Sequence, residues 1–177
     1  MRLGDILRLA AQRDPRKVAL IADGRQLTFA EYDAAANRVA HLLLSAGIGT
    51  GDRVATVLFN SIEYCLVHFG NARAGSVLVH ISPNYAPPEI ARILERTRPR
   101  ILFVDADVAA KIEAVRDRLP FLERIVTVGR DFGEAVAAEA HTPPPVDIDP
   151  TAPVAMTFTG GTTGEPKGAV VSHEARF

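Results

Sequence analysis

The fold is decided by a stretch that runs from residue 53 to residue 81: RVATVLFNSIEYCLVHFGNARAGSVLVHI. Residues 53–59 are rich in apolar and β-branched side chains, which predicts a strand. The pair Asn60-Ser61 then supplies a helix cap, and the apolar residues of 62–74 follow helical spacing until Gly75 ends the run. Residues 77–81 predict the next strand. The stretch is therefore one strand–helix–strand unit.

The same alternation continues toward the C-terminus. Helices are expected from Pro87 onward, over 108–119 and over 132–140, and strands over 101–104 and 124–128. The strand segments do not alternate apolar with polar residues, which is typical of strands buried on both faces. Repeated βα units of this kind predict an α/β fold with a largely parallel, doubly wound sheet and flanking helices.

The first 50 residues have a different pattern. Apolar residues at helical spacing predict a short helix near the N-terminus. Asp23-Gly24 is a two-residue hairpin signal, because both turn positions need positive φ. Thr28 and Glu31 have the capping-box spacing and open a longer helix that Gly47 should end.

These patterns divide the chain into four segments. Residues 1–50 hold the first helix, the hairpin and the long helix, and residues 51–140 hold the βα repeats. Residues 141–152 are a proline-rich linker, which should be stiff. Residues 153–177 hold a strand, a glycine-rich loop and a following β run, after which Ser172 could cap a helix.

Composition excludes several classes of protein. The chain has 177 residues, of which 47% are hydrophobic and 23% charged, and its net charge is −1, so it carries no basic field for nucleic acid or anionic lipid. No apolar run approaches the roughly 20 residues of a membrane helix. Cys65 is the only cysteine and is expected in the core, so no internal disulfide can form. A cytoplasmic location is the expectation.

The chemistry is expected in the loop TFTGGTTGEPKG, residues 157–168. Glycines remove the Cβ atoms that would keep a polyphosphate away, and they allow the turns that form an anion nest. Threonine hydroxyls add donors, and Thr162 or Thr163 could also face a Mg²⁺ ion carried by the phosphates. Lys167 adds a mobile positive charge.

Other interpretations of this loop are weaker. A plain glycine-rich hairpin does not require three threonines and a Pro-Lys-Gly end. A Walker A loop needs Gly directly before Lys and Ser or Thr directly after it, whereas Lys167 lies between Pro166 and Gly168. No G-x-G-x-x-G motif opens a helix after the first strand, so the dinucleotide fingerprint is also missing.

The loop closely resembles the signature of the adenylate-forming superfamily, which includes acyl-CoA synthetases, luciferases and nonribosomal peptide adenylation domains. Its Thr-Gly-Gly-Thr-Thr-Gly form looks most like fatty acyl-CoA ligases. The resemblance extends upstream to blocks that begin at Leu27, Gly51, Asn60 and Ala74, and so covers essentially the whole chain.

The resemblance implies a two-step reaction. A carboxylate, with a fatty acid favoured, attacks the α-phosphate of Mg·ATP to form an acyl-adenylate and pyrophosphate, and the thiol of CoA then displaces AMP. The loop would hold the leaving phosphates and stabilise their charge. The residues that match the motif are Thr159, Gly160, Gly161, Thr162, Thr163, Gly164 and Lys167.

A few other polar residues have two interpretations. His173 is either a wall of the substrate pocket or a helix-start residue with local hydrogen bonds. His80 lies at a strand end, where ligand crevices open, but a structural role is favoured. Asp105 and Asp107 could mimic a metal site, although a strand-end turn before a helix explains both. Glu165 is expected to be a solvated loop charge.

By the same resemblance, the adenine-binding segment, the ribose- and magnesium-binding carboxylates and the catalytic lysine would all follow Phe177. The chain is therefore expected to be an N-terminal fragment with no catalytic residue of its own, and to be inactive by itself. Its apolar faces are expected to be exposed where the missing C-terminal part would cover them, or to favour a homo-oligomer. Two alternatives stay open: a non-catalytic nucleotide- or anion-binding module, and one half of a split enzyme. An unrelated nucleotide-binding α/β domain would need a helix directly after the loop.

Overall fold

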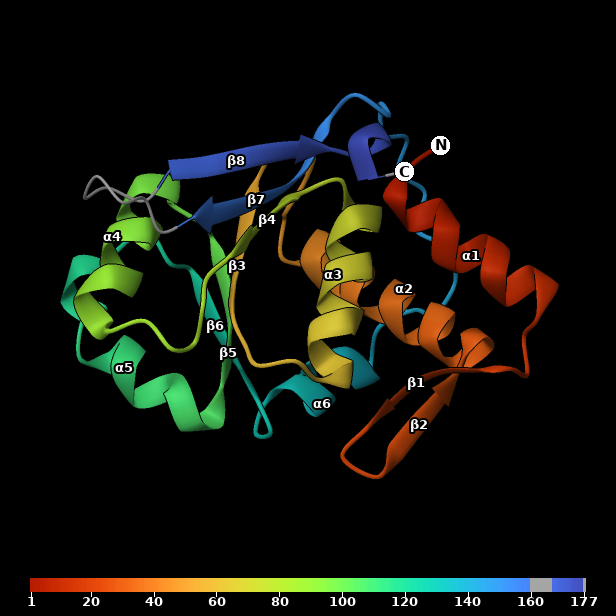
Figure 1. Cartoon of the computed structure of the whole chain (residues 1–177), viewed down its shortest axis with the longest axis horizontal. Helices are drawn as coiled ribbons and strands as arrows, with labels where there is room; N and C mark the ends of the chain where they lie inside the picture. The colour runs from red at the N-terminus through yellow and green to blue at the C-terminus, as the bar shows by residue number, and fades with distance from the viewer. Residues whose placement is uncertain (160–166, 177) are drawn as a thin grey trace.

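A six-stranded sheet forms the centre of the protein (Figure 1). The computed structural model describes residues 1–159 and 167–176. The strand order is β6-β5-β3-β4-β7-β8, in which the first five strands are parallel and β8 runs antiparallel at the edge. The strands are β3 Arg53–Val57, β4 Val77–His80, β5 Ile101–Asp105, β6 Arg124–Val128, β7 Pro153–Thr159 and β8 Lys167–Ser172.

Helices cover both faces of this sheet, and a hairpin lies apart from it. The α-helices are α1 Leu3–Arg13, α2 Phe29–Ser45, α3 Ile62–Ala74, α4 Pro87–Thr97, α5 Ala109–Glu113 and α6 Phe132–Ala137. Short 3₁₀ turns span η1 Ala106–Val108, η2 Arg116–Arg118 and η3 Glu174–Arg176, and the hairpin strands are β1 Val18–Ala22 and β2 Arg25–Thr28.

Neighbouring residues of the central strands point into two different cores. Val54 of β3 belongs to the cluster with α2 and α3, whereas Ala55 belongs to the cluster with α4 and α5. Leu102 and Phe103 of β5 divide in the same way. Both faces of the sheet are therefore apolar and covered, and the predicted largely parallel, doubly wound α/β fold is confirmed.

The opening stretch folds as its sequence predicts. The Ser61 hydroxyl accepts a hydrogen bond from the Tyr64 N–H at 3.1 Å, which caps α3 at its first turn. Gly75 ends the helix with φ near +80°, a conformation that favours glycine. The boundaries 62–74 are those of α3.

The predicted helix over 108–119 is wrong. The segment breaks into η1, α5 and η2, because Val115 leaves the helical conformation with φ near −127°. The Arg116 guanidinium donates to the carbonyl oxygens of Leu119 and Leu122, at 2.6 and 3.3 Å, and so holds the turn that follows η2. Apolar residues of the segment, including Ile112 and Leu119, are still buried.

The helix expected over 132–140 ends earlier, at Ala137. The Arg38 guanidinium of α2 donates to the carbonyl oxygens of Ala137 and Glu139, at 2.9 and 2.6 Å. These contacts hold the chain against α2 and take the place of a further helical turn.

The first 50 residues pack onto the sheet domain through α3. The hairpin turn has positive φ at Asp23 and Gly24, and Thr28 caps α2 in a capping box with Glu31. Gly70 of α3 lies so close to α2 that a Cβ atom there would be 2.6 Å from the side chain of Val39. The assignment of residues 1–50 to a separate subdomain remains a prediction.

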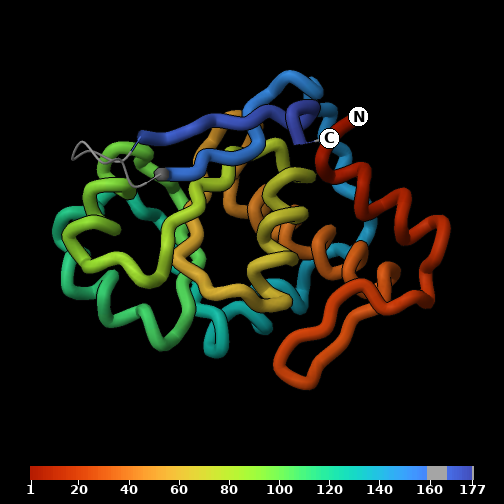
Figure 2. Tube along the Cα trace, viewed as in Figure 1, coloured from red at the N-terminus to blue at the C-terminus, as the bar shows by residue number. Residues whose placement is uncertain are grey.

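The proline-rich linker runs along α2 and leads back to β7 (Figure 2). The Asn37 side-chain amide donates to the His141 carbonyl at 2.8 Å, and the His41 ring contacts the Thr142 carbonyl at 3.0 Å. Ile148 is buried, so the linker carries its own anchor. Leu3 of α1 packs beside Val154 at the start of β7, which brings the N-terminal residues to the final strands.

Several large apolar side chains are exposed, among them Ile21, which is 76% exposed, and Val170 of the edge strand, which is 56% exposed. Ile6 and Leu9 lie on α1, and Val18 and Ile21 lie on β1. The expected homo-oligomer remains a prediction. No helix within the described residues is both long and apolar enough to cross a membrane.

Candidate functional site

The ends of the glycine-rich loop are held together by β7 and β8. Thr159 and Lys167 are backbone partners in the antiparallel pair, so the chain leaves and re-enters the sheet at one point. The predicted phosphate-binding residues Gly160, Gly161, Thr162, Thr163 and Gly164 lie outside the described residues, as does Glu165.

The loop follows the carboxyl end of β7. Thr157 of β7 is the partner of His80 of β4, so the two parallel strands end beside each other. Ligands of open α/β sheets bind outside the carboxyl ends of strands. A strand, β8, follows the loop directly, as predicted. An unrelated nucleotide-binding domain with a helix after the loop does not fit this arrangement.

Lys167 lies at the end of the loop, where β8 begins. Its side chain is exposed at the first position of β8. By contrast, the Lys111 ammonium donates to the carbonyl oxygens of Pro83 and Tyr85, at 2.7 and 3.1 Å, and so fixes the loop after β4. Lys17 is exposed near the hairpin, at the start of β1.

An aromatic and histidine cluster lies beside the strand ends. The Tyr64 hydroxyl and the His80 Nδ1 atom are 2.7 Å apart, and the rings of His68 and His80 are 5.7 Å apart between centroids. These three side chains line a cavity of about 370 Å³ that Thr157 and Arg176 also border. Sequence reasoning favoured a structural role for His80 and missed Tyr64 and His68; their i, i+4 spacing on α3 was the available signal.

Both imidazoles of this cluster are held neutral. Burial, followed by the positive charge of Arg176, lowers the pKa of His68 to about 4. Burial, followed by the charges of His68 and Arg176, lowers the pKa of His80 to about 4. Burial raises the pKa of the Tyr64 hydroxyl. At neutral pH the cluster is therefore an uncharged, hydrogen-bonded wall.

The cluster predicts a pH dependence of stability. Each histidine has a folded pKa of about 4 against an ordinary value of 6.5, so the unfolded chain binds more protons between these pH values. The free energy of unfolding should therefore fall as the pH is lowered from about 6.5 to about 4. Urea unfolding at a series of pH values measures it, and His68→Phe should flatten the dependence.

The exposed His141 provides the control, because His141→Phe should leave the pH dependence unchanged. A His68→Phe profile as steep as that of the unaltered chain would show that His68 is not a source of the effect.

His173 lies elsewhere, directly before η3, and its carbonyl accepts from the Arg176 N–H at 3.4 Å, which fits the helix-start interpretation. Its backbone N–H donates to the Ala152 carbonyl at 3.1 Å, but its fully buried ring has no hydrogen-bond partner among the described residues. It does not border the Tyr64–His80 cavity. A role in the substrate pocket is not tested by these contacts.

Two other residues have structural contacts. Asp105 accepts a hydrogen bond from the Phe59 backbone N–H at 2.6 Å, so its carboxylate fixes the turn after β3. Asp105 ends β5 directly before η1, as expected, but its side chain does not cap that turn. Cys65 is half-buried against the α2–α3 core, and burial raises the pKa of its thiol.

Comparison with known proteins decides the family. The family described as AMP-binding enzyme matches residues 7–176. This chain belongs to the AMP-binding enzyme family. The resemblance to adenylate-forming enzymes that the loop suggested is therefore confirmed, with the match spanning nearly the whole chain.

Two relatives of this chain are ligases of fatty acids. It is 38% identical over 168 residues to the fatty acid–[acyl-carrier-protein] ligase ScoC of Streptomyces coeruleorubidus, covering 94% of this chain and 32% of ScoC. It is 33% identical over 177 residues to the long-chain-fatty-acid–CoA ligase FadD13 of Mycobacterium tuberculosis, covering 98% of this chain and 35% of FadD13. The chain thus spans about a third of the length of these relatives.

Solved structures share the fold. The N-terminal domain of FACL13 from Mycobacterium tuberculosis superposes with a TM-score of 0.93 at 32% identity, covering 98% of this chain and 44% of that domain. The anthranilate CoA ligase AuaEII in complex with anthranoyl-AMP superposes with a TM-score of 0.94 at 29% identity, covering 98% of this chain and 34% of AuaEII. The fold is that of the N-terminal domains of acyl-CoA ligases.

Proposed function

We propose that this chain supplies the phosphate-binding part of an ATP-dependent ligase that activates a carboxylic acid as an acyl-adenylate. One observation supports this most directly: Thr159 and Lys167 are paired, which anchors the threonine- and glycine-rich loop at the carboxyl end of β7. Parallel strands end at the same edge, where α/β proteins bind their ligands.

In this function the loop would position the phosphates of ATP and neutralise part of their negative charge. The acid's carboxylate oxygen attacks the α-phosphorus of ATP, the α–β phosphoanhydride bond breaks, and pyrophosphate leaves. Backbone N–H groups and the Lys167 ammonium would stabilise the negative charge on the leaving phosphates. Mg²⁺ would arrive with ATP and neutralise further charge, and Thr162 or Thr163 would be the hydroxyls to face it.

The acid is proposed to be a fatty acid, because ScoC and FadD13 both act on fatty acids. The acceptor thiol is proposed to be that of CoA, since FadD13 is a CoA ligase and ScoC uses an acyl carrier protein instead. The rest of the site would be contributed by sequence corresponding to the other two-thirds of these relatives. A cytoplasmic location is part of this proposal.

Lys167 tests the proposal. Lys167→Met should weaken ATP binding, measured by calorimetry, by about tenfold or more, because a hydrogen bond to a charged group contributes about 1.5–3 kcal/mol. Lys17→Met removes an exposed lysine that lies far from the loop in sequence and near the hairpin, and should leave the affinity unchanged.

Equal affinity of the Lys167→Met and unaltered chains would contradict the proposed role of the loop. A pyrophosphate-release assay with a fatty acid, ATP and CoA tests whether the chain is inactive by itself. The chain alone is expected to bind ATP without turnover, whereas turnover would show that it holds a complete site.

A further inference from the structure

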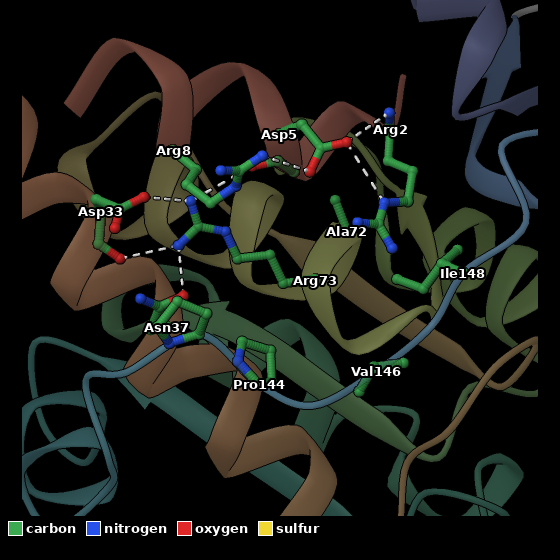
Figure 3. A pocket seen from close by; sticks show the side chains of 12 residues that line it. Arg2, Asp5, Arg8, Asp33, Asn37, Ala72, Arg73, Pro144, Val146 and Ile148 are labelled. Atoms are coloured by element: carbon green, nitrogen blue, oxygen red, sulfur yellow. Dashed lines mark hydrogen bonds and ion pairs between the residues drawn. The ribbon is translucent and has the colours of Figure 1, made fainter. Parts of the chain in front are cut away.

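A small cavity lies between α1, α2, α3 and the linker (Figure 3). Its volume is about 90 Å³. Three guanidinium groups line it: Arg2 just before α1, Arg8 within α1 and Arg73 within α3. The carboxylates that line it belong to Asp5 and Asp33. The lining therefore carries one positive charge in excess.

The three arginines are not equally well paired. The Arg73 guanidinium is saturated by the Asp33 carboxylate, the Asn37 side chain and two backbone carbonyls. Arg2 and Arg8 reach the Asp5 carboxylate only at 3.4 and 3.5 Å, longer than the roughly 2.7–2.9 Å of a strong charge-assisted hydrogen bond.

Donor capacity is left over at Arg2 and Arg8. The other carboxylate beside Arg2 is that of Asp147, at 3.5 Å, and its side chain is fully exposed. A guanidinium has five N–H donors, and among the described residues the contacts of Arg2 and Arg8 use a minority of them. Figure 3 shows Arg2 and Arg8 on either side of Asp5, on the same cavity as Arg73.

The surroundings strengthen the field in this cavity. The opposite wall is apolar and is built from Pro143, Pro144, Val146 and Ile148 of the linker. Nearby, burial lowers the pKa of His173, and the positive charge of Arg2 lowers it further, ahead of the opposing effect of Asp5. Charges in a partly desolvated position attract counterions more strongly than they do in water.

We propose that this cavity binds inorganic phosphate or a phosphate group of the same size. A tetrahedral oxyanion presents oxygens in several directions, which suits the Arg2 and Arg8 guanidiniums on either side of Asp5, and the bidentate geometry of arginine suits its edges. No described residue of β7 or β8 lines the cavity, so this site is separate from the phosphate loop and independent of the proposed function.

The test is phosphate binding to the whole chain, measured by calorimetry with inorganic phosphate at constant ionic strength. Arg8→Met should weaken the affinity by about tenfold or more, because a charged donor is lost from the site. Arg13→Met removes an exposed arginine of the same helix that does not line the cavity and should leave the affinity unchanged. Arg8→Lys should retain part of the affinity.

Three results would overturn the proposal. The first is an absence of phosphate binding by the unaltered chain. The second is an equal loss in Arg8→Met and Arg13→Met, which would indicate a general effect of charge. The third is a signal that Lys167→Met removes and Arg8→Met does not, which would assign the phosphate to the loop. This last result would leave the proposed function standing.

Discussion

Replacing Arg73 with methionine is expected to lower the free energy of unfolding by about 3–5 kcal/mol. The Arg73 side chain is 8% exposed and forms an ion pair with Asp33, which is 19% exposed. It also donates to the Asn37 side chain and to the Gly4 and Asp33 carbonyl oxygens, so one side chain joins α1, α2 and α3. Methionine would keep much of the apolar stem of Arg73, but it would leave the mostly buried Asp33 carboxylate without its partner. Urea unfolding followed by circular dichroism measures the loss.

The matched control is Arg118→Met. Arg118 forms a bidentate pair with Glu95, at 2.8 and 2.9 Å, but both side chains are well exposed. Water screens an exposed pair of this kind, so this change should be nearly neutral. If the two variants lose the same stability, the burial of Arg73 is not the cause.

Replacing Gly70 with alanine is expected to lower the free energy of unfolding by about 3 kcal/mol. The new Cβ atom would be 2.6 Å from the Cβ and Cγ1 atoms of Val39 and 3.0 Å from the Ala36 carbonyl oxygen. Part of this neighbourhood is α2 backbone, so the two helices would have to separate. The core that they share would then lose packing. Thermal unfolding should show the midpoint lowered by roughly 6–12 °C for a chain of this size.

Gly133 provides the control for Gly70. It lies in α6, it has no positive φ, and a Cβ atom there would meet nothing within 4 Å. Gly133→Ala should be neutral, or stabilising by up to about 1 kcal/mol, because alanine loses less backbone entropy in a helix. A Gly70→Ala chain that is as stable as Gly133→Ala would show that α2 and α3 tolerate a wider spacing.

Local signals predicted much of this structure. The cap at Ser61, the turn at Asp23 and the capping box at Thr28 each depend on residues within four positions of one another. The family followed from the loop of residues 157–168 for a similar reason, because a phosphate nest needs its glycines, threonines and lysine close together in the chain.

The two helix errors have different origins. The segment over 108–119 has good helical spacing, yet Val115 leaves the helical conformation and the segment breaks into η1, α5 and η2. The contacts of Arg38 end α6 from α2, about 100 positions away in sequence. The sequence pattern of α6 contains no sign of this contact, because the donor belongs to a different helix.

The sequence by itself determined the βα order, the doubly wound sheet, the position of the loop between β7 and β8, and the family, since each depends on spacing and local backbone preference. Only the tertiary structure decided that Tyr64, His68 and His80 share a cavity and that Arg73 joins three helices. It also decided that Arg2 and Arg8 line the same cavity as Arg73. These groupings join residues up to 71 positions apart. These groupings arise because the packing of apolar faces brings charged and polar side chains from different elements together. Once these side chains are buried, each must pair with a polar group that lies nearby.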